Sequence, residues 1–261
     1  MAKIFAITNQ KGGVGKTTTS VNLAASLAAT RRRILLVDLD PQGNATMGSG
    51  VSKNEIEQTA YELLTKKASF DEVVVRSEIG KYDVVPANGD LTAAEVELLN
   101  EIGREHRLKK VLQDVRDNYE FIIIDCPPSL NMLTVNALSA ADGVLIPMQC
   151  EYYALEGLAA LMSTVEQIKE TVNPDLEISG ILRTMYDPRN SLTKDVTAEL
   201  KEYFGDKLYK VAIPRNVRLA EAPSHGMSVL HYDKSSKGSL AYLALAGEIV
   251  KKMKAEAKLS A

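Results

Sequence analysis

A short segment near the start of the chain combines glycines and lysines at a spacing that suits the binding of phosphate groups. It covers residues 9–18 and reads NQKGGVGKTT. Its glycines allow the backbone to curl so that several N–H groups point at one anion, and a helix that begins there adds the positive end of its dipole. In such a loop Lys16 would reach the β- and γ-phosphates of a nucleotide, and the Thr17 hydroxyl would bind Mg²⁺. A glycine-rich turn with two solvated lysines is the alternative interpretation.

The loop departs from the general phosphate-loop pattern GxxxxGK[ST] in one respect. The first glycine of that pattern would fall at Gln10, and instead a second lysine, Lys11, precedes Lys16 by five residues. The residues predicted to bind nucleotide phosphates are Lys11, Gly12, Gly13, Val14, Gly15, Lys16, Thr17 and Thr18.

Two aspartates follow the next apolar run, in the segment 38–44 that reads DLDPQGN. The carboxyl ends of parallel strands form the ligand-binding edge of an α/β sheet, so both side chains would lie beside the phosphate loop. There Asp40 would orient or activate an attacking water, and Asp38 would hold a water on Mg²⁺. An Asx turn before Pro41 explains the same residues without catalysis.

A third aspartate ends a fully apolar run, in the segment 121–129 that reads FIIIDCPPS. A carboxylate in this position, Asp125, would meet Mg²⁺ through water, because Mg²⁺ in proteins retains several of its waters. The two prolines that follow indicate a stiff turn. A capping aspartate before such a turn is the alternative.

These residues need a parallel sheet to bring them to one edge, and the pattern of the chain predicts one. Short apolar runs alternate with helical segments of ten or more residues, which is typical of a mainly parallel sheet with helices on both faces. Strands are expected over residues 3–8, 34–38, 82–86, 121–125, 144–148, 178–184 and 209–213. Helices are expected over residues 17–29, 61–67, 105–117, 133–141, 155–170, 192–203 and 239–254, with a loop over 42–52. Because no repeat or linker divides the sequence, residues 1–261 are predicted to form a single α/β domain.

Composition and charge exclude several classes of protein. The chain of 261 residues is 45% hydrophobic and 25% charged, which excludes a mainly disordered or collagen-like chain. The sequence has no run of about 18 apolar residues, as a membrane-spanning helix needs, and no signal-peptide core, so a cytoplasmic protein is expected. Its two cysteines, Cys126 and Cys150, form no CxxC pair, which argues against a zinc site or a disulfide framework.

Four motifs in this order resemble those of the ParA/MinD class of P-loop ATPases, and of the ParA/Soj-type partition ATPases within it. The segment KGGVGKTT is similar to their deviant Walker A loop, residues 38–44 to switch I, and residues 121–129 to Walker B and switch II. The segment 213–223, IPRNVRLAEAP, resembles the turn that lies against the adenine. The resemblance covers nearly the whole chain, and it implies the P-loop NTPase fold and Mg²⁺-dependent hydrolysis of ATP to ADP and phosphate.

The resemblance also assigns roles to particular residues. In the family the additional lysine, here Lys11, crosses a dimer interface and contacts the nucleotide of the other subunit, where its charge would stabilise the transferred phosphoryl group much as an arginine finger does. The second aspartate of switch I, here Asp40, is the hydrolytic one. The residues expected to contact adenine are Pro214 and Asn216, with Thr184 and Met185 as further candidates.

The family resemblance implies a function in the segregation of bacterial chromosomes or plasmids. ATP would join two subunits into a sandwich homodimer that binds double-stranded nucleoid DNA without regard to sequence. A ParB-type protein on centromere-like sites would stimulate hydrolysis and so release the dimer. ATP, ADP and Mg²⁺ are the expected cofactors, and a cytoplasmic, nucleoid-associated location is expected. A non-DNA cargo is an alternative for the same mechanism.

One basic region is a candidate DNA-binding surface. Residues 183–218 hold eight basic and five acidic side chains, a local net charge of +3, whereas the whole chain carries −3. Within it, Arg189 and Arg218 lie in the segments that match DNA-binding ones of ParA relatives. Binding of this kind would be directed at phosphates and would weaken steeply with salt. A mixed, solvated surface would have a similar composition.

Three other functions are alternatives. A MinD-like division-site ATPase would bind membrane through a C-terminal amphipathic helix, but the small residues of this helix and its lack of aromatic anchors beyond Tyr242 favour a helix packed on the sheet, without stable membrane insertion. A carrier like the nitrogenase iron protein would need cysteines placed to bridge an iron–sulfur cluster, and Cys126 lies inside the Walker B turn. A metabolic ligase of the dethiobiotin synthetase kind would not require a lysine acting between subunits at Lys11.

Overall fold

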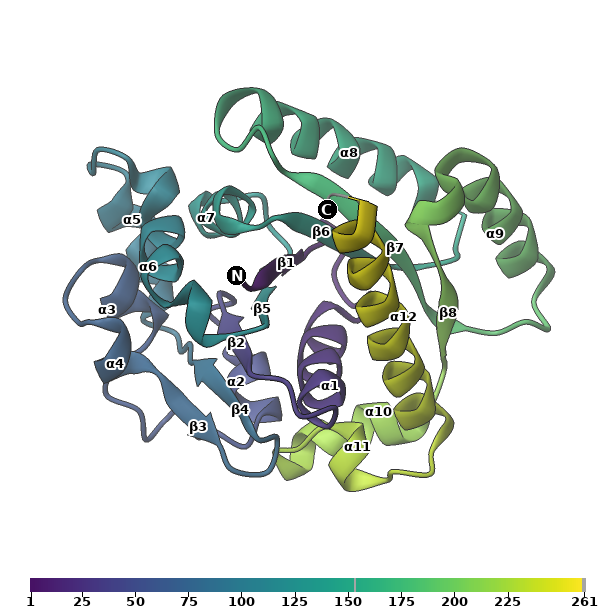
Figure 1. Ribbon diagram of the computed structural model, residues 1–261, viewed down its shortest axis with the longest axis horizontal. Coiled ribbons are helices and arrows are strands. Elements are labelled where there is room, and N and C mark those ends of the chain that lie inside the picture. The colour runs from purple at the N-terminus through teal and green to yellow at the C-terminus, as the bar shows by residue number, and fades with distance from the viewer. Residues whose placement is uncertain (153, 260–261) are drawn as a thin grey trace.

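The apolar runs of the sequence form an eight-stranded sheet in the computed structural model, which describes residues 1–152 and 154–259 (Figure 1). The strand order is β3-β4-β2-β5-β1-β6-β7-β8. The strands are β1 (Lys3–Ile7), β2 (Ile34–Asp38), β3 (Val75–Ser77), β4 (Tyr82–Val85), β5 (Phe121–Asp125), β6 (Gly143–Gln149), β7 (Glu177–Tyr186) and β8 (Leu208–Pro214). Neighbouring strands are parallel except β3 and β4, which confirms the predicted mainly parallel sheet.

The register of the central strands brings three predicted site segments to one edge of the sheet. Ile7, the last residue of β1, pairs with Asp125 at the end of β5, and Asp38 at the end of β2 pairs with the same aspartate. The phosphate loop leaves β1 at this edge, switch I leaves β2 and switch II leaves β5. The carboxyl ends of parallel strands are where ligands bind in open α/β sheets.

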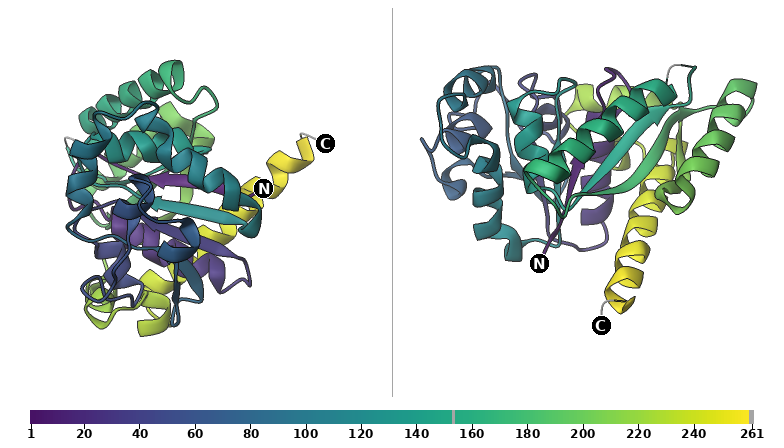
Figure 2. Two further views of the ribbon diagram at one scale, coloured as in Figure 1. Left: turned by 90° about the vertical axis from the view of Figure 1, so that its left-hand side faces the viewer. Right: turned by 90° about the horizontal axis from the view of Figure 1, so that it is seen from above.

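Helices cover both faces of the sheet (Figures 1 and 2). The helices are α1 (Lys16–Ala28), α2 (Asn44–Gly48), α3 (Ala60–Leu64), α4 (Phe70–Val73), α5 (Leu91–Leu98), α6 (Arg107–Val115), α7 (Met132–Ala140), α8 (Ala154–Thr171), α9 (Ser191–Phe204), α10 (Val217–Glu221), α11 (Val229–Tyr232) and α12 (Lys237–Leu259). The described residues also form the 3₁₀ turns η1 (Arg104–His106), η2 (Arg116–Asn118), η3 (Gly205–Lys207) and η4 (Ala222–His225).

Alternate residues of each central strand supply two hydrophobic cores. In β5, Ile122 and Ile124 face the core under α5 to α8, whereas Phe121 and Ile123 face the core under α1 and α12. All five residues of β5 are buried, as expected for a strand covered on both faces. Full burial of one such aliphatic side chain contributes about 1.5–3 kcal/mol, so the two cores hold the site-bearing strands firmly.

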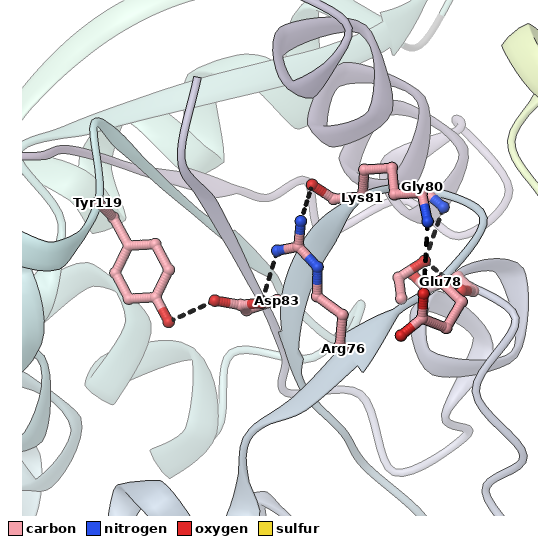
Figure 3. A network of polar contacts seen from close by, with 8 residues as sticks. Arg76, Glu78, Gly80, Lys81, Asp83 and Tyr119 are labelled. Carbon is pink, nitrogen blue, oxygen red and sulfur yellow. Dashed lines mark hydrogen bonds and ion pairs between the residues drawn. The ribbon is translucent and has the colours of Figure 1, made fainter. Parts of the chain in front are cut away.

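Several short elements were not predicted. The predicted loop over residues 42–52 contains α2, and neither β3 nor α5 was predicted. Strand β3 pairs with β4 as an antiparallel edge, which Figure 3 shows from close by. There Arg76 Nη1 donates to Asp83 Oδ1 at 2.7 Å, and the Tyr119 hydroxyl donates to Asp83 Oδ2 at 2.9 Å. This network stabilises the pairing of the three-residue strand β3 with β4.

The last helix, α12, packs on the body of the protein through its apolar face. Its side chains Tyr242, Leu245, Ala246 and Ile249 are buried against α1 and β8. Only its final turns project past the sheet (Figure 2). This agrees with the predicted packed helix, and among the described residues no helix is both long enough and apolar enough to cross a membrane.

The same helix also binds the backbone of β8. Both oxygens of the Glu248 carboxylate accept backbone hydrogen bonds from this strand, from Lys210 N at 2.9 Å and from Val211 N at 3.1 Å. One turn later, Lys252 Nζ lies 4.5 Å from the centre of the Tyr209 ring. These two amides lie where the pairing of β8 with β7 is irregular, and a side chain satisfies them there.

Candidate nucleotide-binding site

The loop between β1 and α1 has the open, curled backbone that was predicted for phosphate binding. Gly13 and Gly15 adopt left-handed φ angles of +72° and +88°, which favour glycine. A Cβ added at Gly12 or Gly13 would meet no atom within 4 Å, so the space above the loop is open. Gly15 is the N-cap of α1, and the helix therefore directs its first N–H groups and its dipole into that space.

Lys16 reaches back over the loop. Its side chain is only 7% exposed, and its Nζ donates to the carbonyl oxygen of Lys11 at 3.3 Å. Burial lowers the pKa of this amine, while the negative charges of Asp125 and Asp40 act in the opposite direction. A buried ammonium group beside such a loop favours an anionic ligand, because the negative charge of the ligand would compensate for the hydration that the ammonium group has lost.

Asp125 is held by two hydroxyl groups of α1. Thr17 Oγ1 donates to Asp125 Oδ2 at 2.8 Å, and Ser20 Oγ donates to Asp125 Oδ1 at 2.7 Å. Burial, followed by the nearby charge of Asp38, raises the pKa of Asp125 to about 8. Hydroxyl and carboxylate oxygens are ligands that Mg²⁺ prefers, so the pair Thr17 and Asp125 suits this ion. Sequence reasoning missed Ser20, which lies one helical turn after Lys16.

Asp38 lies opposite Asp125 and is completely buried. Its Oδ1 accepts from the N–H of Asp40 at 3.1 Å, and its Oδ2 accepts from the N–H and the hydroxyl of Thr46, both at 2.8 Å. Burial raises its pKa to about 6. Both oxygens thus organise switch I, and a role of Asp38 in holding a water on Mg²⁺ stays a prediction.

Asp40 forms the Asx turn that was considered as the alternative to catalysis. Its Oδ1 accepts from the N–H of Gln42 at 3.0 Å, and its carbonyl accepts from the N–H of Gly43 at 2.8 Å. Its charge also acts on Lys16 and on Asp125, which places the carboxylate beside the loop. The Asx turn therefore does not exclude a catalytic role, because Asp40 forms the turn and also lies at the site. The hydrolytic role of Asp40 stays a prediction.

Lys11 points away from the phosphate loop of its own chain. Its Nζ lies 2.6 Å from Oε2 of Glu151, in the loop that follows β6. The two side chains are 45% and 51% exposed. The backbone beneath is fixed, because Asn9 Oδ1 accepts from the N–H of Lys11 at 3.0 Å and Asn9 Nδ2 donates to the carbonyl of Pro147 at 2.8 Å. Sequence reasoning did not identify Glu151.

A mainly apolar cavity of about 330 Å³ lies beside the loop. The predicted base-contacting residues Thr184, Met185, Pro214 and Asn216 line it together with Gly15, Thr18, Ile213, Arg215, Val217, Leu219, Ala220 and Tyr242. The Oδ1 atom of Asn216 is buried and has no hydrogen-bond partner among the described residues. Buried polar atoms are normally paired, so this acceptor suits a donor on a ligand.

The two arginines of the predicted DNA-binding surface are both paired with carboxylates. Arg189, whose side chain is 89% exposed, lies 2.7 Å from Asp187. Arg218, on α10, lies 2.7 Å from Glu221 and 3.4 Å from Asp233. The structure does not bring the two arginines into a common cluster with the nucleotide site, and their contact with DNA stays a prediction.

The loop, the hydroxyl–carboxylate pair and the base-sized cavity at one edge of a parallel sheet define a P-loop nucleotide-binding protein. A family model described as an AAA domain matches residues 2–178. The chain is 55% identical over 249 residues to the sporulation initiation inhibitor protein Soj of Bacillus subtilis (95% of this chain, 98% of that one). It is 52% identical over 252 residues to the chromosome partitioning protein ParA of Myxococcus xanthus (97% and 89%). The chain belongs to the ParA/Soj family of P-loop ATPases.

A solved structure supports the same fold. The structure titled cobyrinic acid a,c-diamide synthase from Mycobacterium smegmatis, with bound ADP and magnesium, superposes with a TM-score of 0.85 at 35% identity and covers 97% of this chain and 96% of that one. The predicted P-loop fold and the ATPase class are thereby confirmed.

Proposed function

We propose that this protein is a partition ATPase whose ATP-bound homodimer carries DNA. The observation that carries the proposal is the position of Lys11, which lies on the exposed rim of the phosphate loop and contacts Glu151 instead of its own loop. A cation in this place is available to the nucleotide of a second subunit. Its charge would stabilise the phosphoryl group in transfer, so hydrolysis would depend on dimerisation.

The residues of one subunit supply the remaining parts of the reaction. The N–H groups of residues 12–18 and the Lys16 ammonium would bind the phosphates of ATP, and Thr17 and Asp125 would hold Mg²⁺. The bound ion neutralises charge on the phosphate oxygens. Asp40 would orient a water in line with the γ-phosphorus and accept its proton. The new bond joins the water oxygen to phosphorus, the bond to the β-phosphate oxygen breaks, and ADP and phosphate leave.

The cavity beside the loop supports adenine as the base. The unpaired Oδ1 of Asn216 is a hydrogen-bond acceptor, and the exocyclic amine of adenine is a donor. Guanine presents a carbonyl oxygen at the same position, which would leave both acceptors unpaired. Because a site built to bond one group rejects an analogue without it, ATP would bind in preference to GTP.

The proposed cargo is double-stranded DNA of the nucleoid, with a ParB-type protein as the partner that stimulates hydrolysis. Arg189 and Arg218 would contact DNA phosphates, which would place the protein on the nucleoid in the cytoplasm. The named relatives Soj and ParA support this assignment. Whether the cargo is a chromosome, a plasmid or another assembly would follow from the partner.

The likeness to the structure titled cobyrinic acid a,c-diamide synthase makes a metabolic ligase the second candidate. A ligase completes its active site within one subunit, so Lys11→Ala should leave its ATP turnover intact. In a partition ATPase the same substitution should abolish hydrolysis.

The decisive experiment measures binding to a random-sequence DNA duplex with ATP, with ADP and without nucleotide, across a salt series. Tight, salt-sensitive binding with ATP alone supports the proposal. If the protein binds no DNA in any of the three nucleotide states, DNA is not the cargo. The MinD-like alternative would then be tested with anionic lipid vesicles.

A further inference from the structure

Thr46, in α2, ties switch I to two strands of the sheet. Its side chain is completely buried. The hydroxyl donates to Asp38 Oδ2 at 2.8 Å and accepts from the N–H of Ala87, just after β4, at 2.9 Å. The N–H of Thr46 donates to the same oxygen of Asp38 at 2.8 Å. One hydroxyl group therefore joins the end of β2, helix α2 and the loop that follows β4.

The other oxygen of Asp38 holds the backbone of the residue proposed to catalyse hydrolysis. Asp38 Oδ1 accepts from the N–H of Asp40 at 3.1 Å. Hydrogen bonds to a carboxylate are stronger than those between neutral groups, and three of them fix the orientation of this one. The place of Asp40 is thus set by a carboxylate that Thr46 orients.

A second contact holds the same turn against the loop after β4. Gly43 has a left-handed φ of +62°, and a Cβ added there would lie 2.5 Å from the carbonyl oxygen of Ala87. The N–H of Ala87 therefore donates to the Thr46 hydroxyl, and its carbonyl lies close to Gly43. These two contacts fix the position of switch I relative to the loop that follows β4.

We infer that Thr46 is a positioning residue for ATP hydrolysis, which acts through Asp38 on the backbone of Asp40. The inference rests on the proposed function, because it takes Asp40 as the hydrolytic aspartate. Loss of the hydroxyl removes a donor from Asp38 and an acceptor from Ala87, and both groups are buried. The switch I turn should then shift, whereas the phosphate loop, which is built on β1 and α1, should keep its shape.

The test compares three substitutions in the full chain. Thr46→Val keeps the size of the side chain and removes the hydroxyl, Thr46→Ser keeps the hydroxyl, and Thr46→Cys retains a weaker donor. The matched control is Thr59→Val, because Thr59 is also buried and also donates its hydroxyl and its N–H to one carboxylate, that of Glu62 in α3. The measurements are kcat for ATP, the dissociation constant for ADP with Mg²⁺, and the melting temperature.

We expect Thr46→Val to lower kcat by about 10- to 100-fold, since a displacement of about 1 Å at a catalytic group has an effect of this size. The affinity of Thr46→Val for ADP should be unchanged, and Thr46→Ser should have a kcat close to that of the wild type. The kcat of Thr46→Cys should lie between those of the serine and valine variants, so this variant tests the inference if Thr46→Val does not fold. Thr59→Val should lower the melting temperature without lowering kcat.

Two results would overturn the inference. One is a wild-type kcat for Thr46→Val while Asp40→Ala is inactive, in which case the proposed function would stand. The other is an equal loss of kcat in Thr46→Val and Thr59→Val, which would show a general effect of stability. If Asp40→Ala itself retained activity, the proposed role of Asp40 would fail whatever the Thr46 variants did.

Discussion

Lys11 Nζ lies 2.6 Å from Glu151 Oε2, although 140 positions separate the two residues in the sequence. The pair joins the phosphate loop after β1 to the loop after β6, two strands that are neighbours in the sheet. Within one subunit, therefore, a carboxylate holds the lysine that is proposed to act on the nucleotide of a second subunit. Dimerisation would have to exchange this partner for a phosphate group.

Substitution Glu151→Gln should strengthen ATP-dependent dimerisation by up to about 30-fold, because a homodimer would give up two exposed ion pairs and each contributes about 0.2–1 kcal/mol. The measurement is the dimer dissociation constant by analytical ultracentrifugation with a non-hydrolysable ATP analogue. Glu97→Gln is the matched control, because Glu97 forms an equally exposed pair with Lys67 at 3.0 Å. Weaker dimerisation of Glu151→Gln would show that Glu151 serves the dimer itself.

Substitution Asp40→Ala should reduce kcat for ATP by about 10²- to 10⁴-fold, the usual contribution of a general base. Binding of ADP with Mg²⁺ should be retained, because the phosphate loop, Thr17 and Asp125 are unaltered. The measurements are phosphate release and calorimetric ADP binding. Asp71→Ala, an exposed position in α4, is the control. Hydrolysis at the wild-type rate would remove Asp40 from the mechanism.

The contribution of Asp125 to the stability of the protein without nucleotide should fall as the pH rises from about 4 to about 8. The pKa of Asp125 is raised from 3.8 to about 8 by burial, so over this range the folded state binds more protons than the unfolded state does. Mg²⁺ favours the ionised carboxylate, and the rise in melting temperature on adding Mg²⁺ with ADP should therefore be larger at pH 8 than at pH 6. Asp125→Asn should remove most of this difference. An equal rise at both pH values would contradict the assignment.

Substitution Arg218→Ala should weaken ATP-dependent DNA binding and reduce the slope of log affinity against log salt by about 1. The double substitution Glu221→Gln with Asp233→Asn should have the opposite effect on affinity, because both carboxylates now neutralise Arg218. Fluorescence anisotropy with a labelled duplex measures both. Arg76→Ala, at a similarly exposed arginine on the β3 edge, is the control. An unchanged slope would exclude Arg218 from the interface.

Sequence reasoning predicted the sheet and the phosphate loop because their signals are local. An apolar run such as 121–124 that is followed by a polar residue and two prolines favours a buried strand, and the glycines at 13 and 15 suit left-handed φ angles. Met185, Pro214 and Asn216, which line the cavity, were predicted as base contacts only through the family resemblance.

What the sequence did not predict depends on contacts between distant segments. The composition of α2, NATMG, is typical of a loop, and the helix is held by the bonds of Thr46 to Asp38 and Ala87. Glu151 could not be identified as the partner of Lys11 without the order of β1 and β6. The carboxylates beside Arg218 are likewise visible only in the fold.

The binding of Glu248 to the backbone of β8 has a consequence for how copies of this protein could assemble. An open sheet edge is a template for pairing with another chain, and such pairing leads to polymers that separate slowly. In this sheet the Glu248 carboxylate binds two amides of the edge strand β8, and the other edge is the three-residue antiparallel strand β3. Both features shorten the stretch of each edge that could pair with another strand, so an association between copies of the protein would use loops and side chains.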